Sequence, residues 1–316
     1  MKRYFKTIDQ QIDILKTRGL IINDENKAKE ILLHYNYYKV INGTIMFFNQ
    51  SKYPYKYERG TTFKEIEAVH VFDKEIKKIF LNSILDIERH LRSIISYTFM
   101  EHHPEANSYL NPDNFNNDRS LIDANIYSMS KTIENFEEEV NYNKSIKYYY
   151  EKYNHVPLWF LINFISFGKL VNFYETMKND EAYEVANDFT KFLNANLPEA
   201  EGYYLTNRQF QTVITNIKEI RNVCAHDNLI LNYKCENDIY DIAPIHDKYD
   251  IERDDDKRDL FNVYIVMQIL LSKKQFSELT GMLKEKIELL RKSVNEKAFH
   301  KVMQSIGFKE AFWGVL

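Results

Sequence analysis

Residues 62–101 read T-F-K-E-I-E-A-V-H-V-F-D-K-E-I-K-K-I-F-L-N-S-I-L-D-I-E-R-H-L-R-S-I-I-S-Y-T-F-M-E, and this stretch predicts one very long helix. Thr62 and Glu65 have the spacing of a capping box, in which two side chains bond each other's backbone N–H groups at a helix start. Apolar residues then recur at steps of three and four, which places them on one helix face. They are Val69, Phe72, Ile76, Ile79, Ile87, Leu91 and Ile94.

The remaining sequence also favours helices over strands. Only 8 Gly and 6 Pro occur in 316 residues, and alternating strand patterns are scarce. A second capping box, Thr206 and Gln209, begins a helix whose apolar stripe reaches Cys224. The expected fold class is all-α. Further helices are expected at 7–18, 25–38, 121–153 and 180–195, in an apolar run after Pro157 and near the C-terminus, with loops at 53–60 and 103–120 and a solvated turn at 251–259.

Composition and charge limit the kinds of protein that this chain can be. The 44% hydrophobic content predicts a folded chain, and the net charge of -4 means that nucleic-acid binding would need a local basic patch. Two cysteines, no apolar segment after the basic N-terminus and no run of ~18 apolar residues predict a cytoplasmic protein without a membrane span. Aromatic residues make up 15%; such rings can stack on bases, but packing in a helical core is the commoner use.

Common catalytic motifs are absent from the sequence. It contains no H-E-x-x-H, no G-x-x-x-x-G-K-[ST] and no G-x-S-x-G. His102 and His103 are adjacent, and adjacent side chains diverge on a regular element, so we expect neither a metal site nor a cofactor. Cys224 lies on an apolar stripe, which favours a buried core thiol over a nucleophile.

The stretch K-E-I-R-N-V-C-A-H-D-N-L, residues 218–229, contains a candidate active-site pair, Arg221 and His226. An exposed arginine and a histidine at the negative end of a helix dipole would also explain the pair. Positions five apart lie about 140° apart around an ideal helix. Both side chains therefore reach one site only if the helix ends near His226 or a second chain contributes. Asp227 and Asn228 are residue types that end helices, which favours the first condition.

A second helix offers a supporting pair. Glu88 and Arg92 are four residues apart and flank the apolar face marked by Ile87 and Leu91. Such a pair can orient a neighbouring arginine or histidine, or it can be a plain ion pair on a helix surface.

R-N-V-C-A-H at 221–226, followed by Asn232, resembles the signature of the abortive-infection AbiD/AbiF proteins, which belong to the HEPN superfamily of helical RNases. One departure is that the downstream arginine of the family pattern H-x-R-L is missing; the residues that follow His226 here include Asp227 and Leu229. Other blocks resemble the family in the family's order, so that the likeness spans nearly the whole chain: R-G-L-I-I at 18–22, Y-N-Y-Y-K-V-I-N-G at 35–43, F-D-K-E-I-K at 72–77, I-L-D-I-E-R-H-L-R-S at 84–93, P-L-W-F at 157–160, S-F-G-K-L at 166–170 and I-G-F-K-E-A-F-W at 306–313.

The resemblance implies a HEPN-type antiparallel helical bundle over residues 61–316, with an insertion around 103–155 and a small helical region at 1–60 before it. It implies a metal-independent endoribonuclease of a phage-defence or toxin–antitoxin system that leaves a 2′,3′-cyclic phosphate. It also implies a composite site in a homodimer and control by a small RNA or another antitoxin. The implied catalytic residues are Arg221 and His226, with Asn222, Glu88 and Arg92 in support.

The chemistry of RNA cleavage suits this pair of residues. The 2′-hydroxyl is the nucleophile, and the reaction needs a base, an acid and positive charge near the phosphorane. Histidine, with an ordinary pKa of ~6.5, suits either proton transfer, and the arginine fork matches phosphate. One chain supplies one of each residue, and a two-fold dimer would supply two of each.

Basic residues near the N-terminus are candidates for RNA contact. Phosphate contacts together with stacking on Tyr4 and Phe5 would explain the pattern, and so would a solvated basic helix face. Two rival functions stay open: a non-catalytic RNA-binding or scaffold protein, and a DNA-binding regulator built on residues 1–60. The RNA-contact candidates are Lys2, Arg3, Lys6, Lys16 and Arg18.

Overall fold

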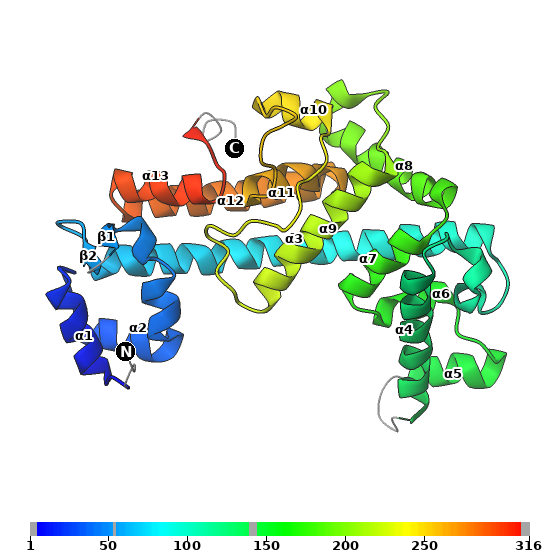
Figure 1. The fold of residues 1–316 in the computed structure, drawn as a ribbon, viewed down its shortest axis with the longest axis horizontal. Helices are drawn as coiled ribbons and strands as arrows, with labels where there is room; N and C mark the ends of the chain where they lie inside the picture. Colours follow the sequence, from blue (N-terminus) through cyan, green and yellow to red (C-terminus); the bar gives the residue numbers. More distant parts are fainter. Residues whose placement is uncertain (1–4, 53–54, 139–143, 311–316) are drawn as a thin grey trace.

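The structure is a computed structural model that describes residues 5–52, 55–138 and 144–310. Its longest element is the helix α3 (Phe63–His102), which runs through the middle of the molecule (Figure 1). Thr62 caps this helix, and the predicted capping box with Glu65 is present. The apolar face is buried, with Val69 and Ile87 fully covered. The first prediction is therefore confirmed to within one residue at the C-terminal end.

Two short helices and a small hairpin lie at the N-terminal end of α3 (Figure 1). The second helix ends three residues earlier than predicted, at Tyr35, because Asn36 takes a positive φ of 66°. The hairpin was not predicted, and the loop expected at 53–60 was wrong at residues 55–57, which form its second strand. The elements are α1 (Ile8–Thr17), α2 (Glu25–Tyr35), the π-helical turn η1 (Tyr38–Asn42), the 3-10 turn η2 (Ile45–Phe47) and the antiparallel strands β1 (Asn49–Lys52) and β2 (Tyr55–Tyr57).

A group of shorter helices surrounds the other end of α3. The apolar run after Pro157 was predicted as one buried helix, but it is divided, because Ile165 is extended and Ser166 caps a new helix. The order is η3 (Ser108–Leu110), η4 (Pro112–Asn114), α4 (Arg119–Glu138), α5 (Lys144–Tyr153), α6 (Leu158–Leu161), η5 (Ile162–Phe164), α7 (Phe167–Thr176) and α8 (Asn179–Asn196).

The C-terminal part of the chain returns along α3. Helix α9 (Asn207–Ala225) crosses α3, and α12 (Lys273–Ser293) packs along it (Figure 1). The predicted capping box of Thr206 and Gln209 begins α9. The remaining elements are η6 (Pro198–Ala200), α10 (Ala243–His246), η7 (Asp247–Tyr249), α11 (Leu260–Val266), η8 (Met267–Ile269) and α13 (Glu296–Ser305).

The buried apolar side chains form one cluster that runs from Ile12 to Phe308. Helices dominate, and the two-stranded hairpin is the whole of the sheet structure within the described ranges. The all-α fold class is thus confirmed, while the division at residue 60 stays a prediction. None of the described helices is long and apolar enough to cross a membrane.

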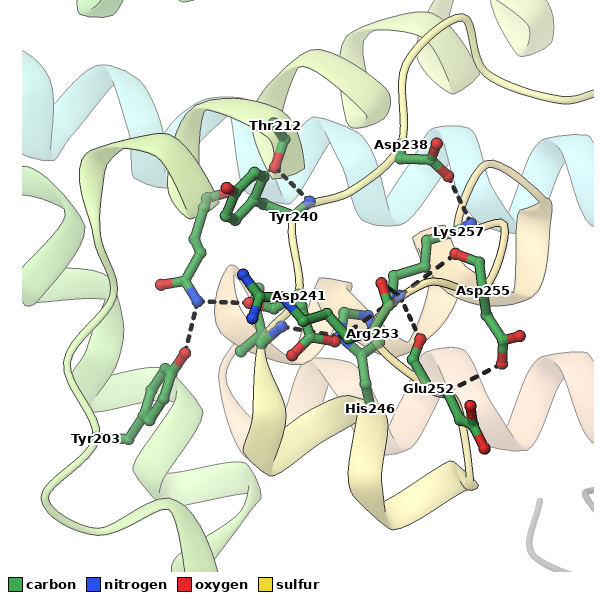
Figure 2. A network of polar contacts seen from close by, with 12 residues as sticks. Tyr203, Thr212, Asp238, Tyr240, Asp241, His246, Glu252, Arg253, Asp255 and Lys257 are labelled. Atoms are coloured by element: carbon green, nitrogen blue, oxygen red, sulfur yellow. Dashed lines mark hydrogen bonds and ion pairs between the residues drawn. The ribbon is translucent and has the colours of Figure 1, made fainter.

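The segment 251–259 is only partly the solvated turn that was predicted. Four of its five acidic side chains are exposed and Asp259 is half-buried, whereas Lys257 is 1% exposed. Figure 2 shows Lys257 beside Glu252 and Asp255. The ammonium group of Lys257 donates to the carbonyl oxygens of Glu252 and Arg253 at 2.6 and 2.7 Å. A lysine can be buried in this way because backbone acceptors replace the water that it loses. This lysine therefore fixes the turn from inside.

Candidate functional site

Helix α9 ends at the candidate histidine. His226 is its C-cap, and Asp227 follows with a positive φ of 52°. The Asn228 N–H donates to the carbonyl of Val223 at 3.0 Å, and the Asp227 N–H donates to that of Cys224 at 3.2 Å. These two bonds define a Schellman motif, in which a residue at positive φ closes the helix. The expectation that the helix ends near His226 is confirmed.

The Glu88 carboxylate joins the two helices that carry the candidate residues. One of its oxygens, Oε1, accepts from Nε of Arg221 at 3.2 Å. The other, Oε2, accepts from Nη2 of Arg92 at 3.4 Å. Glu88 itself is 6% exposed, so the pair that the sequence suggested is not a plain surface ion pair but a buried bridge between α3 and α9.

Arg221 keeps most of its guanidinium free. Its side chain is 31% exposed, and the bond from Nε to Glu88 is its only hydrogen bond or ion pair within the described ranges. Nη1 and Nη2 therefore have donors left for a ligand. Because a carboxylate orients the Nε edge, these donors are held as a fork, which suits the oxygens of a phosphate.

Arg92 is fixed more completely than Arg221. Nη1 donates to the carbonyl of Asn163 at 3.1 Å and Nη2 to that of Ile165 at 2.9 Å, in the segment that joins α6 to α7. Burial lowers the pKa of Arg92, and the positive charge of Arg221 adds to this, while Glu88 opposes both. Arg92 therefore holds Glu88 and the neighbouring chain in place rather than offering donors to a substrate.

His226 and Asn222 lie on the exposed side of the helix end. Neither side chain makes a hydrogen bond or an ion pair to any residue that the structure describes. An exposed imidazole without a partner is available for proton transfer to a ligand. The structure thus brings Glu88, Arg92 and Arg221 into contact. It leaves His226 and Asn222 open to solvent at the end of α9, the helix that also carries Arg221.

Two lysines clamp the turn that follows His226. The Lys77 ammonium donates to Oδ1 of Asp227 at 2.7 Å and to the carbonyl of Asn228 at 3.2 Å. Lys39 donates to the Asp227 carboxylate and, at 3.1 Å, to its carbonyl oxygen. Burial raises the pKa of Asp227, but the hydrogen bonds from Lys39 and Lys77 outweigh it, so the pKa lies below its ordinary value. Asp227 is therefore charged at neutral pH and tied to both α3 and η1.

A buried aspartate completes the clamp. Asp73, 4% exposed, pairs with Lys77 at 2.7 Å and accepts the backbone N–H groups of Ile230 and Leu231 at 3.0 and 3.3 Å. The sequence contains only a local sign of this arrangement, an Asp73–Lys77 pair four residues apart beside the apolar face. The contact to Asp227 joins positions 150 residues apart and was not predicted.

Other candidates from the sequence have structural roles. Cys224 is 8% exposed, and burial raises the pKa of its thiol to about 12, which confirms a core residue. His103 pairs with Glu181 at 2.8 Å and His102 with Glu184 at 2.8 Å, both on α8. In the part of the chain described, no group of three His, Cys, Asp or Glu side chains is arranged to hold a metal ion.

The N-terminal basic candidates lie in different surroundings. Lys2 and Arg3 fall outside the described residues. Lys6 is exposed, whereas Lys16 pairs with Glu25 at 2.7 Å. Arg18 donates to the Tyr37 hydroxyl at 3.5 Å. Lys16 and Arg18 thus already have partners, and the RNA-contact role of the segment stays a prediction.

A family model described as Abi-like protein matches residues 30–232, which is more than half of the chain. The chain belongs to the Abi-like protein family. It is accordingly an abortive-infection protein, as the resemblance implied. The comparison with curated proteins found no match, and neither did the comparison with solved structures.

The family match encloses the site described above. Glu88, Arg92, Arg221 and His226 all lie within the part that matches the Abi-like family, and so does the clamp around Asp227. Helix α1, the first part of α2 and the helices α10, α11, α12 and α13 lie outside the match. The Abi-like part therefore contains every candidate catalytic or supporting residue, but not Lys6, Lys16 or Arg18.

Proposed function

We propose that this abortive-infection protein is a HEPN-type endoribonuclease that cleaves RNA without a metal ion. One observation carries the proposal. The end of α9 presents the guanidinium fork of Arg221, held by Glu88, and the exposed imidazole of His226, which has no partner among the described residues. These are the groups that phosphoryl transfer from RNA requires, with charge for the phosphorane and a group that exchanges a proton.

The proposed reaction uses the nucleophile that RNA itself carries. The 2′-hydroxyl oxygen attacks the adjacent phosphorus and loses its proton, the bond from phosphorus to the 5′-oxygen breaks, and that oxygen takes up a proton. The products are a 2′,3′-cyclic phosphate and a free 5′-hydroxyl. His226 exchanges protons in this scheme, and the free Nη donors of Arg221 bind the phosphate oxygens.

A homodimer would complete the set of catalytic groups. One chain supplies a single His226 and a single Arg221, whereas the reaction needs both a base and an acid. The open side of α9 carries exposed or half-exposed Lys218, Asn222 and Ala225 beside Arg221. A two-fold axis along this side would place two helix ends together, and such dimers are the commonest oligomers.

Regulation belongs to the same proposal. An RNase without restraint would damage its own host, so a small RNA or another antitoxin is expected to hold the protein inactive. Lys6 and the adjacent Phe5, which is 88% exposed, are candidates for contact with RNA.

The direct test is RNA cleavage by the purified protein in EDTA. We expect a single-stranded RNA to be cut to fragments with 2′,3′-cyclic phosphate ends, and the His226→Ala protein to leave it intact. Intact RNA with the wild-type protein, together with measurable RNA binding, would instead support a non-catalytic RNA-binding protein. Equal binding of DNA and RNA would favour a DNA-binding regulator.

A further inference from the structure

A cavity of about 620 Å³ lies beside the candidate site, between α3 and the segment formed by α6 and η5. Its volume is within the range of pockets that hold small organic ligands, which span roughly 300–1,000 Å³. Arg92 lines the cavity and also contacts Glu88, whose other oxygen holds Arg221. The buried carboxylate of Glu88 therefore connects a residue that lines the cavity to the candidate catalytic arginine.

Aromatic rings are exposed on the walls of this cavity. Tyr97 on α3 is 65% exposed and Trp159 on α6 is 50% exposed, and both line it. Exposed tryptophan is uncommon on a protein surface, because a large ring is usually covered. A ring with a free face is a stacking platform for a nucleobase.

The aromatic surface continues from the cavity onto α5. The ring of Tyr149 meets that of Trp159 edge-on, with 5.8 Å between the ring centroids. Beyond it, the Lys152 ammonium lies 5.1 Å from the ring centroids of both Tyr148 and Tyr153. Rings and a cation thus lie next to one another beside the cavity, and this combination is typical of sites that bind a single strand.

Charge at the cavity suits a nucleic-acid backbone. Arg89 lines it, forms an ion pair with Asp86 and keeps 71% of its side chain exposed. Glu101, which accepts from the Tyr97 hydroxyl at 3.3 Å, supplies an acceptor for a base edge. A phosphate near Arg89 and a base near Tyr97 or Trp159 would use both kinds of group.

We propose that this cavity binds unpaired nucleotides of single-stranded RNA next to the phosphate that is cut. One base stacks on Trp159, the adjoining phosphate lies toward Arg89, and the strand leaves over Tyr149 and α5. The location of the cut rests on the proposed function, whereas the binding of the strand does not. A duplex does not fit, because its bases are stacked on each other and cannot reach the rings.

The experiment uses Trp159 as its own reporter. The sequence has two tryptophans, Trp159 and Trp313, so Trp313→Phe leaves Trp159 as the one tryptophan, which can be excited selectively over the tyrosines. In a His226→Ala, Trp313→Phe chain, an unstructured RNA oligonucleotide should quench the fluorescence with the same Kd that fluorescence anisotropy of labelled RNA gives. The same RNA annealed to its complement should bind at least about tenfold more weakly.

Substitutions then test each wall. Trp159→Ala should weaken single-strand binding about tenfold, and Trp159→Phe should keep most of the affinity. Arg89→Glu should weaken binding and reduce its salt dependence. Tyr204→Ala is the matched control, because Tyr204 is 61% exposed and does not line the cavity, and its affinity should equal that of the parent chain.

The outcomes separate this inference from the proposed function. RNA binding without quenching overturns the inference even if the protein cleaves RNA. So does an RNA affinity that neither Trp159→Ala nor Arg89→Glu changes. The absence of any RNA binding overturns it as well. RNA binding with quenching in the Trp313→Phe chain, together with a wild-type chain that does not cleave RNA in EDTA, supports the inference and overturns the proposed function.

Discussion

Arg221 on α9 donates through Nε to a carboxylate oxygen of Glu88 on α3, at 3.2 Å, although the two residues are 133 positions apart. The bond occupies one edge of the guanidinium and leaves the other edge for a ligand. Because Glu88 is buried and also held by Arg92, it fixes the direction of Arg221 rather than only neutralising its charge.

Arg221→Lys should lower the rate of RNA cleavage by about 10² or more, although the charge is kept. An ammonium group cannot bond Glu88 through one edge and a phosphate through a fork at the same time. The control is Arg208→Lys on the same helix, where the guanidinium lies over the ring of Tyr240 at 4.4 Å. Single-turnover rates of both variants give the comparison. A lysine variant as fast as wild type would mean that only charge matters at Arg221.

His226→Ala should lower the cleavage rate by about 10²–10⁴, because a proton-transfer group is lost. Its expression should also relieve any growth inhibition caused by the wild-type protein. His34→Ala is a suitable control, since His34 is an exposed helix residue that lies 3.9 Å from Glu30 and far in sequence from the site. If the His226→Ala protein cleaved RNA at nearly the wild-type rate, His226 would have no part in the mechanism.

Lys77→Met should destabilise the protein by about 3 kcal/mol, because it leaves the buried Asp73 carboxylate without its cation. The neighbouring Lys78→Met is the control: Lys78 is 60% exposed and pairs with Glu75, so its loss should change the free energy of unfolding by less than about 0.5 kcal/mol. Urea denaturation measures both. Equal stability of the two variants would show that the clamp does not hold the turn after His226.

His246 should make the stability of the protein depend on pH between about 4 and 6.5. Burial lowers its pKa to about 4, and its Nδ1 accepts the backbone N–H of Ile242 at 2.8 Å, which favours the neutral ring (Figure 2). In the unfolded chain the pKa is ~6.5, so only the unfolded state binds a proton in this window and stability falls as pH decreases.

His246 should lower the free energy of unfolding by about 3 kcal/mol between pH 7 and pH 4. The His246→Asn protein should lack this pH-dependent change, because the Oδ1 of asparagine can accept the same N–H but does not titrate. The quantity to measure is the difference in unfolding free energy between wild type and variant at several pH values. A difference that stays constant from pH 7 to pH 4 would contradict the neutral buried ring.

Local sequence signals predicted the parts of the fold that depend on local chemistry. The capping boxes at Thr62 and Thr206 and the apolar stripe of α3 determine helix starts and buried faces within a few residues, so they could be identified without a structure. The hairpin at β1 and β2 was missed because three or four residues carry too little alternation. The break at Ile165 was missed because an apolar run looks the same whether it is one helix or two.

The residues of the candidate site could be chosen from the sequence, but their contacts could not. Arg221, His226 and Glu88 were each identified from the sequence, yet their spacing says nothing of which helices meet. The clamp on Asp227 and the cavity beside Arg92 depend on segments that are far apart in the chain and become neighbours only when α3, η1, α6 and α9 pack together.

The proposed composite site is tested most directly by mixing wild-type chains with chains that carry both Arg221→Ala and His226→Ala. The two chains are co-expressed in varied ratios, and cleavage per total protein is plotted against the wild-type fraction. If both chains of a dimer must be intact, activity follows the square of that fraction, so an equal mixture retains about one quarter of the wild-type activity. A straight line, with about one half remaining in the equal mixture, would mean that each chain cleaves RNA by itself and would contradict a site shared between two copies.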